Sequence, residues 1–263
     1  MRKCGICSLF VVTAKSSPTF ETNTSGRIYW SLSGRNARPG RGSSSPIRRT
    51  ASCTSSTLWL VPRGTSGLRI ADASFDGIGL RGNDSNPITA EDAGVPESAR
   101  LGADGAGFGV MMGTVLPWFN VLTAAVSAGL MEAAVTKTAA HAGGTKFEHA
   151  GSSIADLPTV RAYIARMRIA TDQTKALLAD TIAAISTNRA DTMLRVLESK
   201  AAAGEAAAQV TDLAMRVCGG AAFRKEVGVE RIFRDSRAAL VMGPTTDVLY
   251  DFIGKAVCGL PLF

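Results

Sequence analysis

The sequence predicts a mainly α-helical protein, an antiparallel four-helix bundle preceded by a short, partial β-domain. From Asp104 onward, apolar residues recur at spacings of three and four, which is the period of an amphipathic helix. Before that point, short apolar runs are separated by turn-forming Gly, Pro and Asn, as in antiparallel strands. We therefore divide the chain into a basic segment (1–56), a β-domain remnant (57–103) and a helical bundle domain (104–263).

The basic segment differs in composition from the rest of the chain. Its first 55 residues hold nine Lys or Arg against one acid, Glu21, and so account for the whole net charge of +7. It is rich in Ser, Gly and Arg with little apolar periodicity, so we expect it to be poorly ordered. Because the remainder is close to neutral, no basic surface for nucleic acid is indicated.

The cysteine pattern and the hydropathy of the chain indicate the cellular compartment. The five cysteines are an odd number without framework spacing, which favours the cytoplasm. Cys4 and Cys7 form a lone CxxC with no partner pair, so we expect no metal. No charge occurs between Phe108 and Met131, but Pro117 and polar residues interrupt this stretch. We interpret it as a helix buried in the middle of the bundle, and we expect no membrane span.

The remaining helices follow from apolar spacing and glycine. Ile154 to Ile185 reads as one long helix with an apolar stripe, formed by Leu157, Val160, Ile164, Met167, Leu178, Ile182 and Ile185. A third helix begins after Asn188 and ends at Gly219–Gly220, as helices commonly end at glycine. A last helix is expected from about Thr246 to Val257.

Three passages resemble the acyl-CoA dehydrogenase family. The longest runs from Val217 to Arg237 and holds a double glycine, then Val-Glu-Arg, then Arg-Asp in the family's order. Gly79-Leu80-Arg81-Gly82, followed by Val95-Pro96 and Leu101-Gly102, is similar to the end of the family's middle β-domain. Ala124-Ala125 with Gly129-Leu130-Met131 is similar to its first bundle helix. The resemblance covers about Thr57 to the C-terminus.

The family's N-terminal helical domain and first β-strands are not recognised in the sequence. Residues 1–55 stand where those strands belong, and their bias resembles translation of GC-rich sequence in a wrong frame. We hypothesise a truncated or frame-shifted gene product.

The resemblance implies FAD as cofactor. Gly219 and Gly220 match the double-glycine turn with which a neighbouring subunit contributes to the adenosine and pyrophosphate site, where a missing Cβ admits a phosphate. Arg216 occupies the position, three residues before the double glycine, at which the family has a glutamine. Thr245 matches the threonine that hydrogen-bonds a flavin phosphate. For either glycine alone, a simple helix C-cap is an equal alternative.

A further cofactor contact is implied between the first two long helices. Gly144 stands where the family has an arginine that reaches the pyrophosphate, and Lys146, two residues on, can supply the charge. A solvated loop lysine is the simpler alternative.

The proton-abstracting glutamate of the family is not matched. Gly243 occupies its usual position, and the L-E-R motif that carries the base on the first bundle helix of some relatives falls at Trp118, Phe119 and Asn120. We therefore predict no catalytic residue. Asp247 is the nearest carboxylate, and we expect it in the first turn of the last helix.

The function implied by the resemblance is an FAD-dependent oxidoreductase of fatty acid metabolism that acts on the CH–CH bond of acyl-CoA thioesters. Two alternatives stay open: a flavin-dependent monooxygenase of the same fold, which needs no α-proton base, and a non-catalytic helical association module. The family's shared flavin sites imply a homo-dimer or homo-tetramer.

Overall fold

The computed structural model describes residues 10–15, 27–30, 56–71, 76–83, 88–90 and 93–262. The chain forms two compact units. The β-unit comprises Met1–Phe75 and Asp84–Val115, and the helical unit comprises Asp76–Asn83 and Leu116–Phe263. Residues 76–83 therefore belong with the helices, although the strands on either side of them in sequence do not.

The β-unit is built from short antiparallel strands that pair in three groups. They are β1 (Phe10–Lys15), β3 (Ser56–Val61) and β7 (Arg100–Leu101) in the order β1-β3-β7, then β2 (Arg27–Trp30) with β6 (Ala93–Pro96), and β4 (Leu68–Ile70) with β5 (Ile88–Ala90). Trp59, Val61 and Val95 form its small core. The unit ends in the short helix α1 (Gly107–Val110) and a π-helical turn (Met111–Val115).

Two of these strands come from the basic segment. The composition of residues 1–56 did not predict β1 or β2, yet β1 pairs with β3 along six residues and β2 with β6 along four. The rest of that predicted poorly ordered segment lies outside the described residues.

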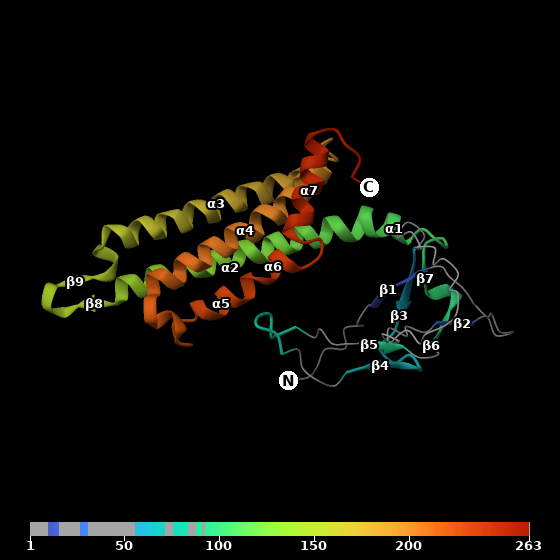
Figure 1. Ribbon diagram of the computed structural model, residues 1–263, viewed down its shortest axis with the longest axis horizontal. Coiled ribbons are helices and arrows are strands. Elements are labelled where there is room, and N and C mark those ends of the chain that lie inside the picture. Colours follow the sequence, from blue (N-terminus) through green and yellow to red (C-terminus); the bar gives the residue numbers. More distant parts are fainter. Residues whose placement is uncertain are drawn as a thin grey trace, which may run out of the picture. The chain divides into compact units, whose positions relative to one another are not determined.

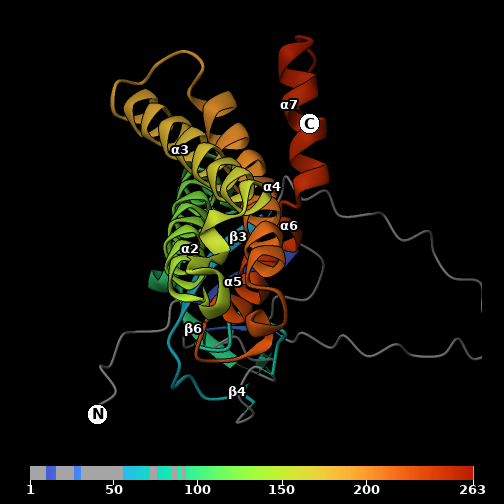
Figure 2. The same ribbon diagram turned by 90° about the vertical axis from the view of Figure 1, so that its left-hand side faces the viewer.

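The helical unit is dominated by three long helices that lie side by side and alternate in direction (Figure 1). They are α2 (Leu116–Gly144), α3 (Pro158–Ser186) and α4 (Thr192–Cys218). Three shorter helices follow: α5 (Val229–Ser236), α6 (Ala238–Val241) and α7 (Thr246–Val257). In Figure 1 α7 stands steeply to the long helices, and in Figure 2 it stands upright to one side of them. The predicted mainly α fold is confirmed.

The start of α3 differs from the prediction because of a proline. Residues Ile154–Asp156 form a 3₁₀ turn, and α3 begins at Pro158. Proline fits the first helical position because its missing N–H has no partner to lose there. The Asp156 carboxylate accepts hydrogen bonds from the Ser153 N–H and hydroxyl at 2.6 and 2.9 Å, which caps the turn.

The buried face of α3 is also offset from the predicted apolar stripe. Met167 is fully buried as expected, but Ile182 and Ile185 are exposed. The buried face of α3 instead includes threonines such as Thr171 and Thr181. Their hydroxyls donate to backbone carbonyls four residues earlier. A threonine whose hydroxyl is satisfied within its own helix can be buried at little penalty.

Among the described residues, helix α2 is packed on one face only, so the prediction of a helix buried in the middle of the bundle is wrong. The segment Gly107–Gly144 is long and apolar enough to cross a membrane, and only 22% of its most apolar window is buried. Trp118, Leu122 and Val126 are each more than half exposed. The opposite face, including Met131 and Ala134, packs into the main core with α3, α4 and α5.

Ion pairs fasten α2 to α3. The Arg168 guanidinium makes two hydrogen bonds of 2.9 Å to the Glu132 carboxylate, and Lys175 also contacts that carboxylate. Hydrogen bonds from Arg168, then from Lys175, lower the pKa of Glu132 to about 2.

Candidate functional site

An apolar pocket of about 270 Å³ lies between α2, α6 and the loop 76–83 of the helical unit. It is lined by Leu80, Phe119, Leu122, Thr123, Val126, Ser127, Leu130, Asp235, Ala238, Ala239 and Met242. Asp235 is the only ionisable residue among them. Such a pocket suits an aliphatic chain, because apolar surface is removed from water without stranding polar groups.

The loop 76–83 is held on α5 by polar contacts. The Leu80 N–H donates to the Asp235 carboxylate at 2.7 Å, and the Arg234 guanidinium donates to the Ile78 carbonyl at 2.7 Å. A Cβ on Gly79 would stand 2.5 Å from the Arg234 carbonyl oxygen, so only glycine permits this approach. Two passages that carried the family resemblance, 155 residues apart, therefore meet here.

The turn between α6 and α7 contributes one residue, Met242, to the lining of this pocket. Gly243, Pro244 and Thr245 follow Met242 and lead into α7. Thr245 is the N-cap of α7, and its hydroxyl oxygen accepts from the Val248 N–H at 3.5 Å. The carbonyls of Met242 and Pro244 accept from the Lys200 ammonium.

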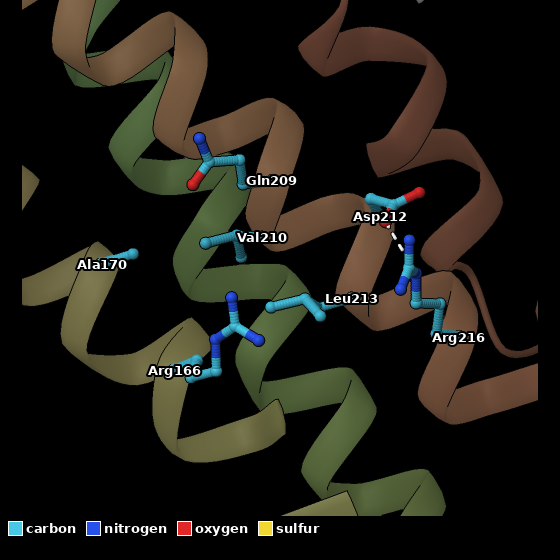
Figure 3. A pocket seen from close by; sticks show the side chains of 7 residues that line it. All are labelled: Arg166, Ala170, Gln209, Val210, Asp212, Leu213 and Arg216. Carbon is cyan, nitrogen blue, oxygen red and sulfur yellow. Dashed lines mark ion pairs between the residues drawn. The ribbon is translucent and has the colours of Figure 1, made fainter. Parts of the chain in front are cut away.

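A second pocket, of about 230 Å³, lies between α3 and α4 (Figure 3); its lining is mixed, and we call it the polar pocket because it contains two guanidinium groups. It is lined by Arg166, Ala170, Gln209, Val210, Asp212, Leu213 and Arg216. Arg216 pairs with Asp212 one turn earlier, at 2.9 Å, whereas Arg166 makes no ion pair within the described part of the chain. With two guanidinium groups against one carboxylate, the pocket favours an anion.

The double glycine follows directly after this pocket. Helix α4 ends at Cys218, and Gly219 has φ +54° and ψ −136°, a conformation that essentially only glycine adopts. Both Gly219 and Gly220 are exposed, and a Cβ on Gly220 would meet nothing within 4 Å. The backbone conformation therefore explains the first glycine, whereas no neighbouring atom among the described residues requires glycine at the second position.

Lys146 lies apart from both pockets. It begins the hairpin of β8 (Lys146–Phe147) and β9 (Ser152–Ser153), at the same end of the bundle as the C-terminus of α4 (Figure 1). Its side chain is exposed and is not part of the polar pocket.

The predicted site residues thus fall into separate groups. Arg216 lines the polar pocket and is followed within one helical turn by Gly219 and Gly220, while Gly243 and Thr245 follow Met242, which lines the apolar pocket. Sequence reasoning missed Arg166, Lys200 and Asp235 as site residues. A motif signal existed only for Asp235, because it lies within the matched Arg-Asp passage.

The base position offers no acid or base in this structure. Gly243 has open space where a side chain would be. Asn120 is fully buried on α2, and both atoms of its carboxamide lack a hydrogen-bond partner among the described residues. Asp247 lies in the first turn of α7, as expected of a residue that complements a helix N-terminus.

Residues 105–258 match the family model described as acyl-CoA dehydrogenase, C-terminal domain. The chain belongs to the acyl-CoA dehydrogenase family. The very long-chain specific acyl-CoA dehydrogenase of Rattus norvegicus mitochondria is 29% identical over 198 residues, covering 72% of this chain and 30% of that protein. The cyclohex-1-ene-1-carbonyl-CoA dehydrogenase of Geobacter metallireducens is 28% identical over 201 residues, covering 76% of this chain and 52% of that protein.

The fold agrees with that of solved family structures. Butyryl-CoA dehydrogenase from Megasphaera elsdenii superposes with a TM-score of 0.72 at 22% identity, covering 78% of this chain and 52% of that one. The chain spans about half the length, or less, of the curated relatives that it matches. Family members are FAD-dependent flavoproteins that bind acyl-CoA substrates and often form oligomers.

Proposed function

We propose that this chain provides the flavin-binding and thioester-binding helical domain of an FAD-dependent oxidoreductase acting on the CH–CH bond of acyl-CoA. The observation that carries this proposal is the apolar pocket lined in part by Met242, the first residue of the turn that bears the family's base position, Gly243, and Thr245. An acyl chain in the pocket would have its polar end at that turn.

The residues fit FAD at two places. At the polar pocket, Arg166 and Arg216 offer charge for a diphosphate, and the exposed backbone at Gly220 leaves room for one to approach. At the other place, the Thr245 hydroxyl accepts from the Val248 N–H, which leaves its own O–H to donate to a phosphate oxygen. The twelve-residue helix that begins there adds the positive end of its dipole.

Separation of these two places supports a flavin shared between two copies of the chain. Arg216 lines the polar pocket near the C-terminus of α4, whereas Thr245 lines neither pocket and caps the N-terminus of α7, as two contacts from different copies would require. We therefore propose a homo-dimer or homo-tetramer in which each FAD contacts Thr245 of one copy and Arg216 of the other.

Reconstitution with FAD tests this arrangement. We expect the purified chain to retain FAD through gel filtration, and Arg216→Glu and Thr245→Val each to lower retention. A mixture of the two variants forms mixed dimers in which one of the two sites is intact, so retention should partly recover. A mixture no better than either variant alone would contradict a shared site.

At a site held by Thr245 and Arg216, FAD would supply a hydride acceptor for the substrate's β-hydrogen. The chain's own contribution is to bind the acyl chain, exclude water from it and hold its polar end at the Met242–Thr245 turn. Gly243 cannot take a proton, and this specific observation favours a second candidate, a flavin-dependent monooxygenase that needs no α-proton base.

The visible spectrum separates the candidates. Under anaerobic conditions, bleaching of bound FAD by octanoyl-CoA supports dehydrogenation. Bound FAD that octanoyl-CoA does not bleach, but that turns over with a reductant and O₂, supports the oxygenase. A protein that stays colourless after reconstitution supports the non-catalytic association module and contradicts both.

A further inference from the structure

Lys200 is a charged residue in the interior of the helical unit. It lies in the ninth position of α4, and none of its surface is exposed. Within the described residues its ammonium has no carboxylate partner, and burial lowers its pKa. An ammonium is expensive to bury, so its retention calls for compensating hydrogen bonds.

Three carbonyl oxygens supply that compensation. The Lys200 Nζ donates to Ala239 at 3.2 Å, Met242 at 3.0 Å and Pro244 at 2.7 Å. These acceptors match the three donors of an ammonium. They lie on α6 and on the turn that follows it, so one side chain of α4 fixes three points of the segment leading to α7.

The same ammonium touches the wall of the apolar pocket. Ala239 and Met242 line that pocket, and so does Phe119, whose ring centroid is 5.9 Å from the Lys200 Nζ. A ring beside an ammonium gains cation–π stabilisation. Lys200 thus connects the α2 wall of the pocket, the α6 wall and the turn that follows α6.

A purely apolar residue at position 200 would fill the same space but would not link α2, α6 and the turn that follows α6. A methionine has similar length, but it would leave the carbonyls of Met242 and Pro244 without their donor. The turn would then be attached chiefly by the Met242 N–H, which donates to the Ala238 carbonyl at 2.9 Å, and by the cap of α7.

We propose that Lys200 is a positioning residue that holds the Met242–Thr245 turn against the apolar pocket and thereby sets the affinity of the pocket for an acyl chain. The link to acyl binding rests on the proposed function, whereas the link to the turn does not. Two measurements on the full chain keep these apart.

The first measurement is hydrogen exchange of peptides covering residues 240–248. In Lys200→Met we expect exchange of this segment about tenfold faster than in the unsubstituted chain, equivalent to about 1.4 kcal/mol. Met167→Ala is the control, because Met167 is equally buried but belongs to α3 and the main core. It should lower the melting temperature without a selective effect on 240–248.

The second measurement is calorimetric binding of octanoyl-CoA. Lys200→Met should bind it about tenfold more weakly, while Met167→Ala stays within about twofold of the unsubstituted chain. Lys200→Gln keeps two N–H donors on a shorter side chain and is expected to lie between; it replaces the methionine variant if that one does not fold.

The two measurements distinguish failure of the proposed role of Lys200 from failure of the proposed function. Exchange of 240–248 in Lys200→Met as slow as in the unsubstituted chain overturns the proposal, and so does equal acceleration in Met167→Ala. If the unsubstituted chain does not bind octanoyl-CoA, the proposed function fails, and hydrogen exchange still decides whether Lys200 holds the turn.

Discussion

Replacing Gly79 by alanine is the sharpest available perturbation of the contact between the loop 76–83 and α5. The added Cβ would lie 2.5 Å from the Arg234 carbonyl oxygen, 2.7 Å from its carbonyl carbon and 2.9 Å from the Asp235 nitrogen. All three atoms are backbone, so no side chain can rotate away. Gly82, three residues along the same loop, has nothing within 4 Å of its Cβ position and gives a matched control.

The magnitude follows from the contacts at stake. Moving the Arg234 oxygen from 2.5 Å to at least 3.0 Å requires the loop and α5 to separate, and overpacking of this kind costs roughly 1–3 kcal/mol. The separation also lengthens the 2.7 Å hydrogen bonds at Leu80 and Ile78. For Gly79→Ala we expect a loss of about 2 kcal/mol, which for a chain of this size lowers the melting midpoint by roughly 4–8 °C.

Thermal unfolding followed by far-ultraviolet circular dichroism measures this difference, since the helical unit dominates the signal. Gly82→Ala should melt within about 0.5 kcal/mol of the unsubstituted chain. Equal midpoints for the two variants would refute the close approach of Gly79 to α5.

The remaining predictions concern charge, backbone and cofactor. Arg168 lowers the pKa of Glu132 to about 2, below the ordinary value of 4.5; because the unfolded state binds more protons between these values, the Glu132 contribution to stability is present above pH 4.5 and is lost as pH falls towards 2. In urea unfolding, Glu132→Gln should therefore differ from the unsubstituted chain near neutral pH and converge with it in acid; a constant difference would contradict the ion pair. Gly219→Ala should lower the free energy of unfolding by about 1–3 kcal/mol because the φ of Gly219 is +54°. Gly220→Ala should leave the melting midpoint unchanged and weaken FAD binding. A larger loss of stability in Gly220→Ala than in Gly219→Ala would contradict the turn geometry. Arg216→Glu should weaken FAD binding measured by equilibrium dialysis without changing the melting midpoint, and unchanged binding would exclude the polar pocket as an FAD contact.

Local signals in the sequence were sufficient for the end of α4 and for both ends of α7, but not for the start of α3. The double glycine ends α4 because Gly219 adopts a conformation that other residues avoid, and the last helix runs from Thr246 to Val257 as predicted. At the start of α3, a run of apolar spacing continued through Ile154, and the proline at 158 set the boundary instead.

Features that depend on distant contacts could not be predicted. Lys200 stands in an alanine-rich helix, where a single charge suggests a solvated position, and its burial depends on carbonyls about 40 residues away. The attachment of Leu80 to Asp235 spans 155 residues. The open face of α2 was missed because uninterrupted apolar composition does not distinguish a surrounded helix from one with an uncovered side.

The candidate site was predictable only as far as the motif matches reached. Gly219, Gly220 and Thr245 were found from the resemblance, and their assignment to FAD stays a prediction. The division between two pockets was not apparent, because sequence order does not reveal that Arg216 and Thr245 serve different places in one unit.

The central claim is that the apolar pocket holds an acyl chain beside flavin bound at the Met242–Thr245 turn. The most direct test is anaerobic titration of the FAD-loaded chain with octanoyl-CoA while the visible flavin absorbance is recorded. We predict a saturable change in that absorbance, by bleaching or by a shift of the band, which Lys200→Met moves to higher octanoyl-CoA concentration. Flavin that stays bound and spectrally unchanged at saturating octanoyl-CoA would contradict the account.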